Sequence, residues 1–225
     1  MSIAASTIID KVAYHLQDVT NVRWSRVELL RWLSAGERLI TVLQPSSTNT
    51  IAIVALAAGS RQAIPSDGWI LLDVIRNMGT SGTTPGRSVR IVSRRLLEAF
   101  RTSWHSDTPV TEVQNYTFDM QDQTAFFVYP PSDGTGKLEI NYSALPAPLT
   151  SESQSIGVPD SYEEALTHYV MFRALTKNAE WAANSQGAQY LELFNAVMGS
   201  KVSAEDANNP NLGLAPPSPQ TGGVS

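Results

Sequence analysis

Residues 1–45 carry apolar side chains at helical spacing in two successive stretches. In the first, Ser6 is a candidate N-cap, and the apolar positions that follow it are Ile9, Val12, Ala13 and Leu16. In the second, Ser25 and Glu28 form the Ser-x-x-Glu pattern of a capping box, with Trp24 ahead of it as a candidate hydrophobic staple. Its apolar stripe, which ends before Pro45, consists of Leu29, Trp32, Leu33, Gly36, Leu39, Ile40 and Leu43. The pattern predicts two amphipathic helices, and Gly36 within the second favours close approach of another helix.

From residue 48 the apolar positions alternate, which is the period of a β-strand. Residues 48–56 and 61–64 are expected to form a β-hairpin, because Ala58-Gly59-Ser60 between them is a turn sequence. The other elements expected here are, in chain order, a strand over 69–78, a glycine-rich loop over 79–86, a strand over 87–92, a short helix that Ser93 can cap and that runs through Phe100, and strands over 115–119, 124–129 and 137–143. The sequence from Pro130 to Gly134 is expected to be the turn between the last two strands.

Helical spacing returns after Pro159. Asp160 and Glu163 resemble a second capping box, which predicts a helix through about residue 177, and another helix is expected over 185–201. The order of elements predicts an α+β fold, in which N- and C-terminal helices form a helical bundle with an inserted antiparallel β domain, plus an extended C-terminal tail. The expected domains are residues 1–46 and 159–203 for the bundle, 47–158 for the β insert with its short helix, and 204–225 for the tail.

Composition narrows the class of protein. Charged residues make up 16% of the chain, below the roughly 25% of an average soluble domain, which favours surfaces that are buried against other subunits. The net charge of −5 opposes sequence-independent binding to nucleic acid. The chain has no cysteine, which excludes disulfides, thiolate catalysis and cysteine-ligated metals. Neither a secretory signal nor an apolar run of about 20 residues is present, so we expect assembly in the cytoplasm and no membrane partner.

One cluster of basic residues stands out against this acidic background. It consists of Arg87, Arg90, Arg94, Arg95 and Arg101, and it is interleaved with apolar residues. This spacing is typical of the solvated face of an amphipathic element. Among functional interpretations, contact with an acidic partner subunit is favoured. We therefore take Arg87, Arg90, Arg94 and Arg95, with the nearby Trp104, as candidate subunit or partner contacts.

Catalytic and metal-binding patterns are weak. His15, His105 and His168 lie on separate elements, and only His168 has a carboxylate, Glu164, at helical spacing. The run Trp104-His105-Ser106-Asp107 holds triad residue types as sequence neighbours, whereas catalytic triads bring them together from separate elements. It is expected to be a surface loop with an aromatic anchor.

Three further patterns have structural interpretations that outweigh the chemical ones. The loop 79–86 lacks the Gly-Lys-Ser/Thr ending of a phosphate-binding loop and is expected to be a hairpin tip. Asp119 and Asp122 are expected to make turn hydrogen bonds. The aromatic set, which favours a sheet core or a subunit interface, is Phe126, Phe127, Tyr129 and Tyr142. No catalytic residue, metal ligand or cofactor is predicted.

The last segment, 208–225, has four prolines, three glycines and no charged side chain. Such a composition cannot form a packed core alone. An extended proline-rich segment can instead lie in a groove of a neighbouring protein. The candidate partner-binding residues of this segment are Pro210, Asn211, Leu212, Leu214, Pro216, Pro217 and Pro219.

Four ordered blocks resemble the head-to-tail adaptor (connector) proteins of short-tailed bacteriophages. They are RWSRVELLRWL at 23–33, AIPSDG with LLDVIRNMG within 63–79, YTFD with FVYPP within 116–131, and ALTHYVMFRALTKNAE at 165–180. The order of the blocks is their specific part, and together they span roughly residues 5–210.

The resemblance implies a non-enzymatic virion protein at the head-tail junction. Such adaptors form a ring, usually of about twelve copies, between the portal protein and the tail nozzle or tail tube. Helical ends would face the portal, the β insert would face the tail, and the C-terminal segment would clip into the portal. Genomic DNA would pass through the lumen without specific binding, which suits a net negative charge. Two alternatives stay open: a hydrolase using Asp119, Asp122 and a histidine, and a DNA-contacting protein using Arg87–Arg101.

Overall fold

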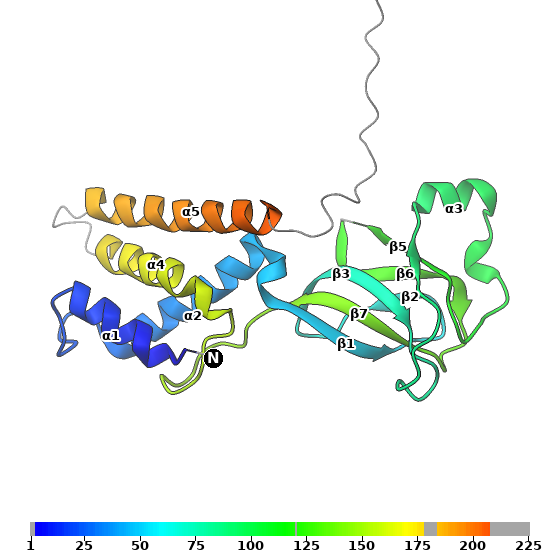
Figure 1. Ribbon diagram of the computed structural model, residues 1–225, viewed down its shortest axis with the longest axis horizontal. Helices are drawn as coiled ribbons and strands as arrows, with labels where there is room; N and C mark the ends of the chain where they lie inside the picture. The colour runs from blue at the N-terminus through cyan, green and yellow to red at the C-terminus, as the bar shows by residue number, and fades with distance from the viewer. Residues whose placement is uncertain (1–2, 120, 178–183, 208–225) are drawn as a thin grey trace, which may run out of the picture.

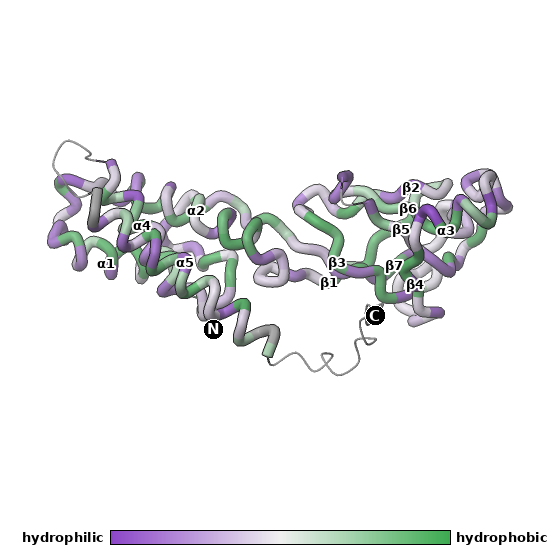
Figure 2. Tube along the Cα trace, turned by 90° about the horizontal axis from the view of Figure 1, so that it is seen from above, coloured by the Kyte–Doolittle hydropathy of each residue, from purple (hydrophilic) through white to green (hydrophobic). Residues whose placement is uncertain are grey.

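The structure is a computed structural model that describes residues 3–119, 121–177 and 184–207. The chain is elongated, with the longer helices gathered at one end and the strands, together with the short helix α3 (Arg94–Phe100), at the other (Figure 1). The view from above shows the same separation (Figure 2). We call these two regions the helical part and the β part. The chain is a mixed α+β protein, as expected.

Four helices and a later connecting segment share the apolar core of the helical part. The helices are α1 (Ala5–His15), α2 (Arg26–Leu43), α4 (Glu163–Thr176) and α5 (Asn184–Ala207). Helix α4 packs against the other three. A Cβ added to Gly36 would lie 2.8 Å from Tyr169 Cδ1 of α4, so the predicted close approach of a second helix is confirmed. The largest fully buried side chains here are Ile8, Ile9, Leu29, Leu33, Ile40, Tyr162, Leu166 and Phe194.

Of the four predicted helix caps, only Ser25 makes a capping hydrogen bond; Ser93 precedes α3 (Arg94–Phe100) as expected, but its side chain makes no cap bond. Ser25 accepts a hydrogen bond from the backbone of Glu28 and begins α2. The prediction for Ser6 is wrong, because α1 begins at Ala5 after Ala4. Carbonyl oxygens of Gln154 and Glu152 accept its first amide protons instead, from the nitrogens of Ala5 and Ser6, at N···O distances of 2.8 and 2.9 Å.

The predicted capping box at Asp160 is also wrong. Residues Asp160–Tyr162 form a short 3-10 helix, η3, and α4 begins after it. The Asp160 carboxylate accepts a hydrogen bond from the backbone of Ile3, at 3.0 Å. It therefore holds the N-terminal segment rather than capping its own helix.

The β part consists of two sheets. One has the strand order β1-β7-β3 and the other β2-β6-β5-β4. The strands are β1 (Asn49–Ala55), β2 (Gly59–Ala63), β3 (Gly68–Asn77), β4 (Arg90–Ile91), β5 (Asn115–Asp119), β6 (Asp122–Ser132) and β7 (Lys137–Ala144). Their shared core contains Leu71, Val74, Val113, Tyr116, Phe126, Val128, Leu138 and Ile140. A 3-10 helix, η1 (Pro45–Thr48), joins α2 to β1.

The predicted hairpin of 48–56 with 61–64 is wrong, because its two strands join different sheets. β1 pairs with β7, and β2 pairs with β6. The Gln62 side chain bonds both the backbone N–H and the carbonyl of Ala57. The Gln62 side chain therefore pairs the backbone N–H and C=O groups of Ala57, which a hairpin ladder would otherwise have paired.

The predicted turn at Pro130–Gly134 begins too early, because β6 continues through both prolines to Ser132. The peptide bond between Tyr129 and Pro130 is cis. The ladder with β2 shifts between Phe127 and Ser132. Pro130 and Pro131 lie within this irregular stretch, where the ladder with β2 needs no backbone N–H from them.

The segment that returns from the β part, residues 145–160, is called the strap here. Its backbone nitrogen at Leu145 donates to Asp67 at one end. At the other end Ile156 and Val158 lie in the core of the helical part. The strap thus ties the two parts together, although 145–158 had been expected to belong to the β insert.

Helix α5 continues to Ala207, past its expected end at 201 and past the boundary expected at 203. The expected tail residues from 208 onwards lie outside the described residues.

Candidate partner interface

The arginine-rich segment 87–101 lies at the end of the β part that is farthest from the helices (Figure 1). β4 pairs parallel to β5, and α3 (Arg94–Phe100) begins after Ser93. No side chain of α3 is buried. Isolated helices this short are unstable in water. A helix that buries nothing in its own chain is suited to contact another protein.

Two arginines of the segment have acidic neighbours. Arg94 Nε lies 2.7 Å from Glu98 Oε1, and Arg101 Nε lies 3.0 Å from Asp107 Oδ2. Among the described residues, no carboxylate forms an ion pair with Arg87, Arg90 or Arg95. These three exposed guanidinium groups give the end of the molecule a local positive charge on a chain of net charge −5.

Large apolar side chains are interleaved with these arginines. Ile91, Leu96 and Phe100 are 66%, 54% and 83% exposed. A solvated amphipathic face would turn such residues inward, so the interpretation as an ordinary solvated face does not fit this segment. We call the surface formed by Arg87, Arg90, Ile91, Arg95, Leu96 and Phe100 the distal tip.

An open groove of about 700 Å³ runs between α3 and the end of β5. Both signs of charge line it, from Arg94 and Arg95 on one side and Asp119 on the other. Asp119 Oδ2 lies 3.9 Å from Arg94. The groove is therefore suited to polar contacts with a protein surface rather than to a single small anion.

Trp104 differs from the other predicted contact residues because its side chain is completely buried. Its ring stacks on His105 at 3.5 Å between centroids and meets Phe127 and Tyr129 edge-on. It begins η2 (Trp104–Ser106), the 3-10 helix that follows α3. The indole is thus not available to a partner in this structure. Trp104 therefore acts as the predicted aromatic anchor and packs beneath the distal tip.

The three histidines do not form one cluster: His105 lies in the β part, while His15 ends α1 in the helical part, near enough to His168 for its charge to act on it. His105 Nδ1 lies 2.7 Å from Ser60 Oγ in the β part. His168 lies in the helical part, 3.4 Å from Glu164, and burial lowers its pKa. No group of three potential metal ligands occurs in the described chain.

The two aspartates considered for catalysis or cation binding make ordinary local contacts. Asp119 accepts a hydrogen bond from the backbone of Gln121, and Asp122 accepts one from the hydroxyl of Thr124. Asp122 also pairs with Arg61 at 3.2 Å. Both carboxylates have the turn hydrogen bonds that the sequence predicted.

The glycine-rich loop 79–86 connects β3 to Ser88, which bridges back to Arg76. Gly79 and Gly82 have φ angles of +62° and +83°, which glycine adopts without strain. A Cβ at Gly82 would lie 3.2 Å from Ile53 and 3.0 Å from Lys137. The loop is a close-packed chain reversal, consistent with the hairpin tip that was expected.

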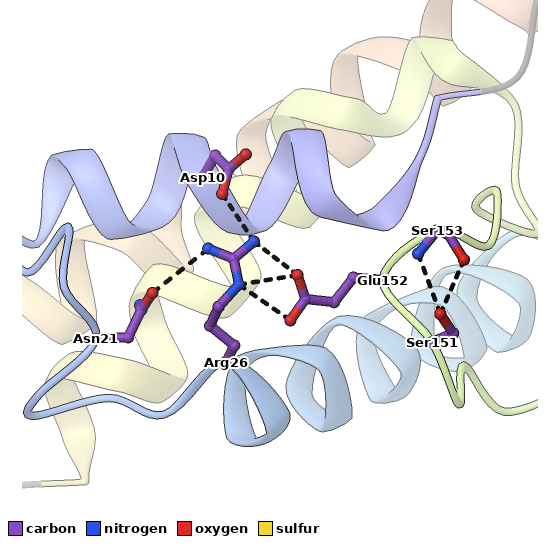
Figure 3. A network of polar contacts seen from close by, with 6 residues as sticks. All are labelled: Asp10, Asn21, Arg26, Ser151, Glu152 and Ser153. Carbon is purple, nitrogen blue, oxygen red and sulfur yellow. Dashed lines mark hydrogen bonds and ion pairs between the residues drawn. The ribbon is translucent and has the colours of Figure 1, made fainter.

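A polar network in the helical part was missed by the sequence reasoning. Arg26, the first residue of α2, binds Glu152 of the strap, Asp10 of α1 and Asn21 of the turn between α1 and α2 (Figure 3). The shortest of these contacts joins Arg26 and Glu152 at 2.7 Å. Glu152 and Asp10 raise the pKa of Arg26 above its usual value. One side chain therefore fixes three segments that are distant in sequence.

A second missed feature is a row of buried polar residues along α2 and at its C-cap, namely Ser34, Glu37, Thr41 and Gln44. Ser34 Oγ accepts a hydrogen bond from Leu149 of the strap, and Glu37 Oε1 accepts one from Gly157. Gln44 Oε1 accepts one from the Tyr162 hydroxyl. The row holds the strap against α2. The members of the row are three or four residues apart, which is helical spacing. Apolar residues alone define the stripe used to predict α2, so the polar row was not recognised.

Glu37 is the most unusual member of the row. Its side chain is completely buried, and its Oε2 has no hydrogen-bond partner in the described structure. Burial raises the pKa of Glu37 to about 7, while the bond from Gly157 opposes the change.

The candidate residues of the C-terminal segment, from Pro210 to Pro219, lie outside the described residues. No helix in the described chain is long and apolar enough to span a membrane.

Comparisons with known proteins identify the family. A family model described as SU10 adaptor protein matches residues 3–214. A search of curated proteins found no match. Because the model covers both the helical part and the β part, this chain belongs to the SU10 adaptor protein family of phage head-to-tail adaptors, which are structural proteins of the virion.

Proposed function

We propose that this protein assembles as a ring between the portal vertex of the capsid and the tail, and that the ring continues the DNA channel. The observation that carries the proposal is the distal tip, an exposed surface at one end of an elongated chain, with three large apolar residues and three arginines that have no ion-pair partner among the described residues. Membership of an adaptor family supplies the class of partner.

The two parts suit different partners. The helical part has an apolar core and polar contacts that join its segments, which suits a stiff element that sets the spacing in a ring. The β part carries the distal tip at the far end, which suits contact with a tail component. In this arrangement the helical end faces the portal, and residues 208–225 bind the portal protein. We expect about twelve copies, as in rings of similar adaptors.

Binding to the two partners tests the arrangement. Portal rings are mixed with the full chain, with a chain that lacks residues 208–225, and with the variant Arg90→Ser/Arg95→Ser/Phe100→Ser. We expect truncation to abolish cosedimentation with the portal, while the tip variant binds the portal like the wild type but no longer binds the tail nozzle protein. Equal portal binding by the truncated chain would refute the role of the C-terminal segment.

A DNA-contacting role is the second candidate, because Arg87, Arg90 and Arg95 are exposed and have no acidic partner among the described residues. Binding to phosphates falls steeply as salt rises. Retention of the chain on DNA cellulose that disappears in the same tip variant would support this role, and absence of retention at low salt would exclude it.

A further inference from the structure

Strand β1 is an edge strand whose outer side has no partner in the described structure. It pairs only with β7, in one unbroken antiparallel register. The amide of Leu56, directly after β1, donates to Gly136 in the same register. Since backbone groups alternate along a strand, Ile51 and Ile53 direct their N–H and C=O groups away from β7. An edge of this kind is a template for another strand.

The other sheet edges carry the protections that natural proteins use against such pairing. β3 has three register shifts, β2 has a bulge and carries Arg61, and β4 has only two residues. β1 has seven residues with no charge, no proline and no bulge. It is the regular, uncharged edge of the described sheets.

The sequence of β1 identifies the occupant. The centre of β1 is the same in both directions: Ile51 mirrors Ile53 about Ala52, and Thr50 mirrors Val54, which has the same shape, while the outer pair, Asn49 and Ala55, differs. Two antiparallel copies centred on Ala52 would therefore match like with like. We infer that the free protein forms a two-fold dimer in which β1 pairs with β1 of a second copy, joining two three-stranded sheets into one.

This register satisfies the free backbone groups. It sets Ile51 of one copy opposite Ile53 of the other as a hydrogen-bonded pair, and the same pair recurs across the two-fold axis. Ile51 and Ile53 are 59% and 47% exposed in the single chain. Cross-strand contact between β-branched side chains stabilises such pairs. No charge opposes the contact on either copy.

The contact is small, because one strand edge buries less than the roughly 1,200 Å² of a stable interface. A weak dimer whose population depends on concentration is expected. The dimer is distinct from the proposed ring, because a two-fold contact uses the same surface on both copies, whereas a ring uses two unlike surfaces. It covers the β1 edge in the free protein, before assembly.

Cross-linking tests the register directly, because the chain has no cysteine of its own. Facing residues of a hydrogen-bonded pair have Cα atoms about 5.5 Å apart, which a disulfide can bridge. An equimolar mixture of Ile51→Cys and Ile53→Cys should form a disulfide-linked dimer on mild oxidation. Each variant alone should cross-link weakly, and so should Ile51→Cys mixed with Leu72→Cys, whose partly exposed side chain lies on β3 at the opposite edge. Equal cross-linking in all mixtures, or none in any, would overturn the proposed pairing.

Sedimentation measures the same contact without a cross-link. Ile53→Pro removes an outward N–H that β7 does not use, so the strand itself is retained. We expect it to weaken the dimer by about tenfold or more, while Ile53→Val leaves the dissociation constant nearly unchanged. Circular dichroism confirms that both variants fold. If the wild type and Ile53→Pro sediment alike, either both as monomers or both as dimers, the inference is contradicted. The proposed ring does not depend on the β1 contact, so Ile53→Pro should bind the portal like the wild type. Portal binding therefore distinguishes failure of the dimer from failure of the ring.

Discussion

Helices α1 and α3 show two ways in which a short helix is held. α1 buries five side chains in the core of the helical part, and its first amides are bonded by the strap. α3 buries none, and exposed arginines and apolar side chains cover it. Since most helical stability in proteins comes from tertiary packing, α1 is fixed by its own chain. α3 is not fixed in this way, which fits the proposal that it contacts another protein.

The largest expected effect is at Trp104, the buried side chain that packs beneath the exposed α3 segment. Trp104→Ala should lower the free energy of unfolding by about 3–5 kcal/mol, because it empties a fully buried site against Phe127 and Tyr129. Urea denaturation measures it, and Trp104→Phe, which keeps part of the contact, should cost less. A loss below about 1 kcal/mol would mean that the support beneath the distal tip lies elsewhere.

The next effect concerns the buried row that holds the strap. Glu37 has a raised pKa of about 7, against an ordinary value of 4.5, so the folded state binds a proton more tightly than the unfolded state. Ionising this buried carboxyl therefore destabilises the folded state. The loss of stability is absent below pH 4.5, grows as pH rises to about 7, and then stays constant. It amounts to about 3 kcal/mol.

Glu37→Gln should remove this slope from urea-derived stabilities measured between pH 4.5 and 8. The difference between variant and wild type isolates Glu37, because the lowered pKa of His168 contributes a slope of opposite sign to both proteins. Parallel curves for the two proteins would show that Glu37 does not titrate in this window.

A smaller effect tests the close packing of α2 on α4. Gly36→Ala gains about 1 kcal/mol of helix propensity, but its Cβ meets Tyr169 at 2.8 Å, and overpacking costs about 1–3 kcal/mol. We expect a net loss of stability in thermal unfolding. The matched control is Gly199→Ala on α5, where an added Cβ meets nothing within 4 Å, so stability should rise. Equal shifts for both variants would remove the argument for close packing.

The smallest effect is expected at the distal tip. Phe100→Ser should change the free energy of unfolding by less than about 0.5 kcal/mol, because the side chain is 83% exposed. Its melting temperature should match that of the wild type while binding to the tail nozzle protein falls. A clear loss of stability would place α3 with α1, among the helices that their own chain supports.

Local patterns predicted the elements that local forces determine. The capping box at Ser25 correctly gave the start of α2, and the small residue Gly36 correctly indicated a close helix. Partners far away in sequence were not predictable in this way. β7 lies between β1 and β3, so the pairing of β1 is decided by a strand that appears about 90 residues later.

The candidate site was predicted in part. The arginine cluster was visible in the sequence, but whether its apolar neighbours turn inward depends on which side of α3 the rest of the chain covers. Trp104 was singled out, yet its burial required contacts from β6, which spacing alone does not show. Glu37 was missed because a charged residue on a helix is usually solvated.

The bonds from the strap to α1 also set an order of events during synthesis. The amides of Ala5 and Ser6 are completed by carbonyls of Gln154 and Glu152, which are synthesised roughly 7–30 s later at about 5–20 residues per second. Every strand of the β part is made before that moment. The first amides of the first helix are thus completed late, and its apolar stripe stays open to chaperones and to other nascent chains until α4, which follows the strap and packs on α1, is made.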